Sequence, residues 1–196
     1  MGKKNVRVPE KKESSDQRPE EKQKVSRKQY LRELRKTILI LAATFAGVLL
    51  LAWLVLPVFR ITGDAMDPTL QEGNIVLSIK SRNLKEGDLA AIRYSDKILM
   101  RRIIGLPGDR IEMDESGTVL VNGEVVPEAY VSNPGTGQAD IGFPLEVPEG
   151  KYFVLGDNRS VSIDSRSSAI GCIPEEMIAG KLVLRIFPLD EMEALS

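Results

Sequence analysis

The chain has 196 residues, which is enough for one sizeable core and a tail, and its net charge of −1 at pH 7 hides an uneven distribution. It contains no histidine, which excludes Ser-His and Cys-His catalysis and argues against a zinc site, and nothing in its motifs indicates a cofactor or a nucleic-acid partner. A single cysteine excludes an internal disulfide, so the fold must be held by its core.

The first part of the chain is basic. Residues 1–36 carry 13 Lys and Arg against 6 Asp and Glu, whereas the chain from residue 60 onward carries 14 against 22. Residues 1–25 are poor in apolar side chains and are expected to be disordered. A basic arm is either a solvated tail or a segment attracted to anionic lipid, and the apolar segment that follows favours lipid. We expect residues 1–36 to form a cytoplasmic arm that includes the start of a helix.

An uncharged apolar segment follows at residues 37–56, with the sequence TILILAATFAGVLLLAWLVL. Twenty helical residues span about 30 Å, the thickness of the hydrocarbon core. The capping-box spacing in SRKQ at 26–29 allows an earlier helix start, and Pro57 is a natural end. The alternative is a cleaved secretory signal, but the segment is long for one and no A-x-A pattern follows it. We therefore predict a single-pass membrane anchor with a cytoplasmic N-terminus and an extracytoplasmic remainder.

Strand patterns dominate from residue 60 to residue 188. Apolar and β-branched residues predict strands at 74–79, 88–94, 98–104, 118–121, 124–126, 151–155 and 181–187. Asn122 and Gly123 predict a hairpin turn, and residues 133–140 form a Gly- and Pro-bearing loop. The predicted fold class is mostly β, with one N-terminal transmembrane helix followed by an antiparallel β-sheet body at 60–188 and an acidic tail at 189–196.

Three ordered sequence boxes carry the functional signal. They read GDAMDPTL at 63–70, a second box from Gly87 and Asp88 through LMRRIIGLPGD at 99–109, and GDNRSVSIDSR at 156–166. Together with the anchor, these boxes resemble the type I signal peptidases (leader peptidases of the S26 type), membrane-anchored proteases with a serine nucleophile and a lysine base. The resemblance covers about residues 37–188 and implies a β-sheet body beside the membrane.

The resemblance places Ala65 at the position of the nucleophilic serine and Arg101 at the position of the general-base lysine. Alanine has no oxygen to attack with, and a guanidinium cannot be deprotonated in a protein. By the same resemblance, Ser162 matches the serine that hydrogen-bonds the lysine, and Asp164 and Arg166 match an acid–base pair that braces the site. These residues can equally serve only to hold strands together.

Several side chains have a plain structural interpretation beside a functional one. Met66, Leu99 and Met100 line the peptide groove that the resemblance implies, or simply fill the core. Cys172 is better explained as buried filler than as a nucleophile. Arg101 is a candidate ion-pair partner of Asp164. Other hydroxyl groups in or near the boxes offer an alternative nucleophile, but none has a histidine to activate it; they are Thr69, Ser162, Ser165, Ser167 and Ser168. Lys97 is expected in a solvated turn.

The sequence therefore predicts a non-proteolytic relative that binds a peptide or preprotein. The resemblance extends to inactive proteins of Gram-positive pilus assembly, which implies a pilin and a sortase as candidate partners. Two simultaneous losses favour natural inactivation over an engineered trap. The alternatives are an active signal peptidase that uses another nucleophile or is represented by an inactivated sequence, and a structural protein whose β body is an assembly surface. The sequence leaves the oligomeric state open.

Overall fold

The computed structural model describes residues 20–81 and 83–195 and consists of two compact units, Met1–Leu50 and Leu51–Ser196. The first contains most of helix α1 (Glu20–Val55), which begins earlier than the expected start near residue 26. Residues 20–25 are thus helical and not disordered as expected, and the rest of that expectation, residues 1–19, lies outside the described part. Pro57 follows the end of the helix, as expected of a residue that cannot continue one.

The apolar part of α1 is long enough to cross a bilayer. Residues 27–51 have a mean hydropathy of 1.9, and none of their side chains is buried by the protein. The hydroxyls of Thr37 and Thr44 donate to the carbonyl oxygens of Glu33 and Ile40, each at 3.0 Å, so that the helix satisfies these polar groups itself. By length and composition the helix is consistent with a membrane anchor or a secretory signal sequence.

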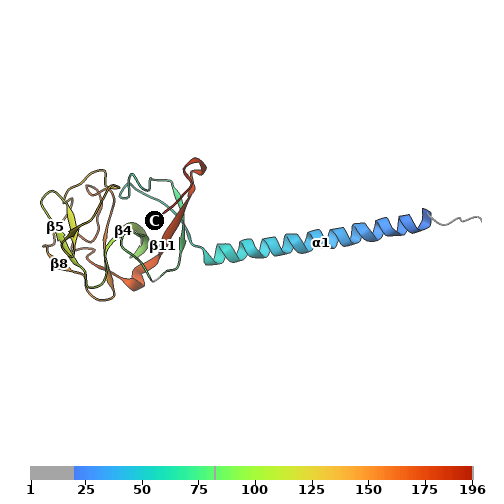
Figure 1. The fold of residues 1–196 in the computed structure, drawn as a ribbon, viewed down its shortest axis with the longest axis horizontal. Coiled ribbons are helices and arrows are strands. Elements are labelled where there is room, and N and C mark those ends of the chain that lie inside the picture. The colour runs from blue at the N-terminus through green and yellow to red at the C-terminus, as the bar shows by residue number, and fades with distance from the viewer. Residues whose placement is uncertain (1–19, 82, 196) are drawn as a thin grey trace, which may run out of the picture. The chain divides into compact units, whose positions relative to one another are not determined.

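The second unit is built from antiparallel strands (Figure 1). The larger sheet has the order β1-β2-β11-β3-β4-β9-β10, and β12 also pairs with β11. Its strands are β1 (Val58–Arg60), β2 (Ile75–Ile79), β3 (Leu89–Tyr94), β4 (Lys97–Gly105), β9 (Lys151–Leu155), β10 (Ile173–Pro174), β11 (Ile178–Phe187) and β12 (Glu193–Ala194). Two single-turn 3-10 helices, η1 (Glu175–Met177) and η2 (Leu189–Glu191), flank β11. The mostly β, antiparallel fold class is confirmed.

A smaller sheet has the order β7-β6-β5-β8, with strands β5 (Arg110–Met113), β6 (Val119–Val121), β7 (Glu124–Val125) and β8 (Leu145–Glu146). Asn122 and Gly123 both have positive φ, at 55° and 84°, and connect β6 to β7 as the Asn-Gly signal predicted. Figure 1 shows β5 and β8 together at one end of the body, away from β11.

Each of the seven predicted strands is present, as β2, β3, β4, β6, β7, β9 and β11. Buried residues alternate with partly exposed ones in β2, and four consecutive residues of β9 are buried, so both of its faces are covered. The sequence did not predict β1, β5, β8, β10 or β12. Residues 189–195, expected to be part of an acidic tail, instead contribute β12, and Leu195 is only 7% exposed.

Three apolar clusters fill the body. One lies beneath β2, β3 and β11, a second beneath β3 and β9, and a third joins the smaller sheet to β9. Met66 and Met100 belong to the first, Leu99 packs against the second, and half-buried Cys172 packs against the third. Burial raises the pKa of the Cys172 thiol, which disfavours the reactive thiolate and supports the packing interpretation of this cysteine.

Candidate functional site

The three sequence boxes meet in space. The carbonyl oxygen of Ala65 accepts the N–H of Asn158 at 3.1 Å, which ties the first box to the third. Nη2 of Arg101 donates to the carbonyl oxygen of Ile163 at 2.8 Å, which ties the second box to the third. Residues separated by up to about a hundred positions in the chain therefore form one local structure, as the order of the boxes led us to expect.

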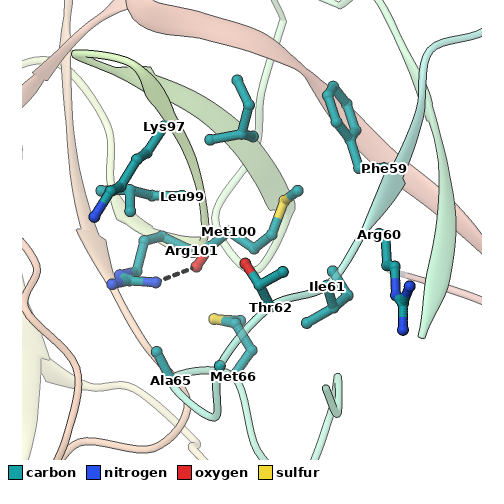
Figure 2. A pocket seen from close by; sticks show the side chains of 12 residues that line it. Phe59, Arg60, Ile61, Thr62, Ala65, Met66, Lys97, Leu99, Met100 and Arg101 are labelled. Carbon is teal, nitrogen blue, oxygen red and sulfur yellow. Dashed lines mark hydrogen bonds between the residues drawn. The ribbon is translucent and has the colours of Figure 1, made fainter. Parts of the chain in front are cut away.

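Ala65 and Arg101 line one cavity of about 540 Å³ (Figure 2). The wall comes from β1, the loop that follows it and β4, and its lining residues are Phe59, Arg60, Ile61, Thr62, Gly63, Ala65, Met66, Lys97, Ile98, Leu99, Met100 and Arg101. Met66, Leu99 and Met100 are therefore both core and cavity residues, so the two interpretations of these side chains are compatible. The lining is mainly apolar, with cationic groups and no acidic residue.

Lys97, Leu99 and Arg101 share one face of β4 because side chains alternate along a strand. All three also line a second cavity of about 460 Å³, with Val161 and Ile163 on its other side. The expectation of a solvated turn for Lys97 is right about exposure and wrong about the turn, because Lys97 is the first residue of β4, and it lines both cavities. The spacing of two residues between Lys97, Leu99 and Arg101 was the sequence signal that could have placed Lys97 on the same face as Arg101.

The Arg101 side chain is only 7% exposed. Its Nη1 donates to the carbonyl oxygen of Met100 at 2.6 Å and its Nη2 to Ile163, while its Nε is buried without a partner among the described residues. The expected ion pair with Asp164 is therefore wrong. Burial lowers the pKa of the Arg101 guanidinium, Asp164 opposes this shift, and Arg166 adds to it. A guanidinium nevertheless stays protonated in a protein.

Asp164 is occupied by other groups. Its Oδ1 accepts Nε of Arg166 at 2.8 Å, and its Oδ2 accepts the N–H of Gly156 at 3.0 Å and Nη2 of Arg166 at 2.9 Å. Arg166 further donates to the carbonyl oxygens of Thr136 and Arg159, each at 2.9 Å. The pair thus ties the third box to the loop at 133–140, and its role as a brace of the site stays a prediction.

Ser162 and Ala65 approach the same point of the backbone. A Cβ added to Gly156 would lie 2.2 Å from the Ser162 hydroxyl oxygen and 2.6 Å from the Ala65 carbonyl oxygen, so only glycine fits there. The hydroxyl of Ser162 is buried and has no hydrogen-bond partner among residues 20–81 and 83–195. The N–H of Ala65 likewise has no partner in that part of the chain.

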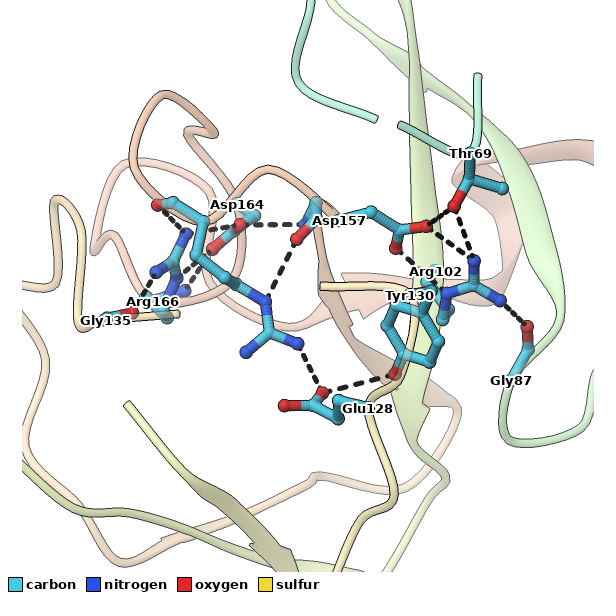
Figure 3. A network of polar contacts seen from close by, with 11 residues as sticks. Thr69, Gly87, Arg102, Glu128, Tyr130, Gly135, Asp157, Asp164 and Arg166 are labelled. Carbon is cyan, nitrogen blue, oxygen red and sulfur yellow. Dashed lines mark hydrogen bonds and ion pairs between the residues drawn. The ribbon is translucent and has the colours of Figure 1, made fainter. Parts of the chain in front are cut away.

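A second polar network, which the sequence did not reveal, lies on the other face of β4 (Figure 3). Arg102 pairs with Asp157 at 2.5 Å and also donates to the carbonyl oxygen of Gly87 at 2.9 Å. The ring of Tyr130 lies 3.8 Å from its guanidinium carbon, and Thr69 donates to Asp157 at 2.5 Å. Burial and the neighbouring carboxylate of Glu128 raise the pKa of Tyr130, so its hydroxyl stays neutral.

The comparisons with known proteins show to which family the chain belongs. Residues 31–187 match the family described as signal peptidase, peptidase S26. The chain is 35% identical over 185 residues to signal peptidase I of Bacillus licheniformis, covering 88% of this chain and 97% of the relative. It is 32% identical over 182 residues to signal peptidase IB of Staphylococcus aureus, covering 83% and 94%. A crystal structure of a signal peptidase I from Enterococcus faecalis V583 is 31% identical, with a TM-score of 0.43, over 51% of this chain and 97% of that one.

The fold and the contacts between the three boxes place the chain in a class of β proteins that resemble signal peptidases and carry an apolar N-terminal helix. The chain belongs to the signal peptidase family, peptidase S26.

Proposed function

We propose that this chain is a non-proteolytic member of its family that holds an extended peptide segment of a preprotein. The observation that supports the proposal is that Ala65 and Arg101 line the larger cavity together. The resemblance implies that they stand at the positions of the serine and the lysine. A methyl group cannot attack a carbonyl carbon, and a protonated guanidinium cannot accept the proton of a nucleophile.

The surrounding structure supports retained binding. The wall is mainly apolar, and an extended peptide can add main-chain hydrogen bonds beside a strand while its side chains enter apolar hollows. The ion pair of Asp164 and Arg166 is buried and holds the third box, which contributes Val161 and Ile163 to the wall of the second cavity. The groove needs no hydroxyl nucleophile for this role.

We further propose that the apolar helix is a retained single-pass anchor at residues 37–56, with the basic arm cytoplasmic and the acidic β body outside the cell membrane. The excess of Lys and Arg before the apolar segment supports this orientation. The ligand is then an exported precursor, for which a pilin with its sortase is the candidate that the family resemblance suggests. A pilin or sortase gene beside this one would support that assignment.

An active signal peptidase is the second candidate, and the names of the similar proteins favour it. The hydroxyl of Thr62 and the amine of Lys97 both lie on the cavity wall, so this candidate has a nucleophile and a base to test. Neither residue belongs to the motif positions of the family dyad.

Incubation of the full chain with a preprotein in detergent separates the two candidates. We expect a stable complex and no mature N-terminus, and the complex should weaken when the bound segment is scrambled. Release of a mature N-terminus that disappears in Thr62→Val or Lys97→Gln would establish the second candidate. Binding that survives scrambling would contradict peptide recognition and favour a general assembly surface.

A further inference from the structure

The larger cavity has a charge opposite to that of the body that contains it. From residue 60 onward the chain has 22 acidic against 14 basic residues, yet the residues lining this cavity include Arg60, Lys97 and Arg101 and no acid. Figure 2 shows Lys97 and Arg101 on the same side of the hollow. A local excess of positive charge inside an acidic body selects for an anionic ligand group.

Arg101 is the cation best placed to meet such a group. Its side chain is 7% exposed, so it is more than nine-tenths buried. Its two terminal nitrogens bond only carbonyl oxygens, and its Nε–H has no partner among the described residues. The nearby carboxylate, Asp164, is already paired with Arg166. Arg101, Asp164 and Arg166 therefore carry one uncompensated positive charge, and a buried charge without a counterion is costly.

A further donor lies on the wall of the same cavity. The N–H of Ala65 has no partner among the described residues. A carboxylate accepts several hydrogen bonds at once and forms its strongest ones with a guanidinium. The unused donors and the unbalanced charge fit the same ligand group.

We infer that the segment held by this protein presents the carboxylate of an internal Asp or Glu side chain to Arg101, flanked by small or apolar residues. The inference rests on the proposed peptide-holding function. Arg101 lines both cavities, so an extended ligand that occupies both passes this residue and does not end there. Apolar side chains then enter the mainly apolar hollows on either side, and Lys97 lies four residues before Arg101 on the same face of β4.

The test compares two short peptides of Ala and Val residues, blocked at both ends, with a central Glu in one and Gln in the other. Binding is measured by fluorescence anisotropy on the full chain in detergent. A charge-assisted hydrogen bond in a dry site predicts that the Glu peptide binds about tenfold tighter or more. Equal affinities would overturn the inference and leave the peptide-holding function standing, whereas no binding of either peptide would overturn both.

A third peptide checks the source of the carboxylate. It carries the central Gln and a free C-terminal acid, and tighter binding of this peptide than of the blocked Glu peptide would overturn the inference in favour of a chain end. The Arg101→Gln variant should abolish the preference for Glu over Gln. The matched control is Arg110→Gln, at an exposed arginine paired with Glu112 on β5, which should keep the preference unchanged. The comparison of peptides on the unmodified chain does not depend on any variant folding.

Discussion

Two neighbouring arginines on opposite faces of β4, Arg101 and Arg102, have different hydrogen-bond and ion-pair partners. Arg101 and Arg102 are almost equally buried, at 7% and 5% exposed. Every guanidinium nitrogen of Arg102 has a partner, and Asp157 neutralises its charge, whereas Arg101 bonds only carbonyl oxygens and lines a cavity. The comparison shows that one buried arginine is neutralised by a carboxylate inside the body, whereas its neighbour lines a cavity and has no ion-pair partner among the described residues.

The largest effect is expected where a fully buried ion pair is broken. Asp164→Ala leaves Arg166 charged, buried and unpaired, and it removes the acceptor of the Gly156 N–H. We expect the free energy of unfolding to fall by roughly 3–5 kcal/mol. Urea unfolding of the full chain in detergent, followed by circular dichroism, measures the change.

Glu112→Ala is the matched control for Asp164→Ala, because it removes the carboxylate of the exposed pair with Arg110. It should cost about 1 kcal/mol or less. A loss as small for Asp164→Ala would show that the pair does not brace the body.

The two arginines of β4 provide the next test. Arg102→Met removes the partner of buried Asp157 and should lower the free energy of unfolding by roughly 3–5 kcal/mol. Arg101→Met removes a desolvated charge that has no carboxylate partner, so we expect a loss of about 1.5 kcal/mol at most, or a gain. Parallel urea titrations of the two variants give the difference. Equal losses would contradict the distinction between the two faces.

A smaller effect on the free energy of unfolding is expected at Gly156, whose backbone lies close to Ala65 and Ser162. In Gly156→Ala the new methyl group meets the Ser162 side chain and the Ala65 carbonyl group, and we expect a loss of about 1–3 kcal/mol together with weaker peptide binding. Gly142→Ala is the control, since a Cβ there meets nothing within 4 Å and its φ is not positive. Thermal unfolding and anisotropy follow the two properties, and an unchanged Gly156→Ala protein would show that the close approach is not required.

The smallest effect is expected at the exposed loop beside the brace. Asp140 accepts hydrogen bonds from the N–H and, at 2.9 Å, the hydroxyl of Ser168, and these bonds lower the pKa of its carboxyl group. Because its pKa is lower in the folded than in the unfolded state, ionised Asp140 stabilises the protein at pH values above the pKa of the unfolded state, about 4. This stabilisation is lost as the pH falls through the pKa of the folded state. Asp140→Asn should therefore lower the melting temperature slightly at pH 7, with a difference that shrinks below about pH 4. A difference that grows toward low pH would contradict this sign.

The sequence predicted those parts of the body whose pattern is local. Strands such as β9 follow from continuous β-branched and aromatic runs, and the β6–β7 turn follows from Asn122 and Gly123. The two-residue strand β12 has too little pattern of its own and forms by pairing with the long strand β11. The helix start was misplaced because the polar residues from Glu20 onward continue a helix whose apolar part lies further along.

The site was predictable as a set of boxes but not as a set of contacts. The order of the boxes indicated that Ala65, Arg101 and Asp164 belong together. It did not show that both oxygens of Asp164 are already occupied, which is why the ion pair with Arg101 was wrongly expected. Nor did it show the bond between Thr69 and Asp157, which lie 88 residues apart. Pairings of this kind depend on strand order, and strand order is a property of the whole sheet.

Native mass spectrometry of the full chain with a preprotein tests the central claim most directly, because it records binding and cleavage in one spectrum. The account predicts a complex whose mass is the sum of the two intact chains and that persists with time. The appearance of the mature polypeptide at a defined bond, in a preparation shown to be free of other proteases, would contradict it.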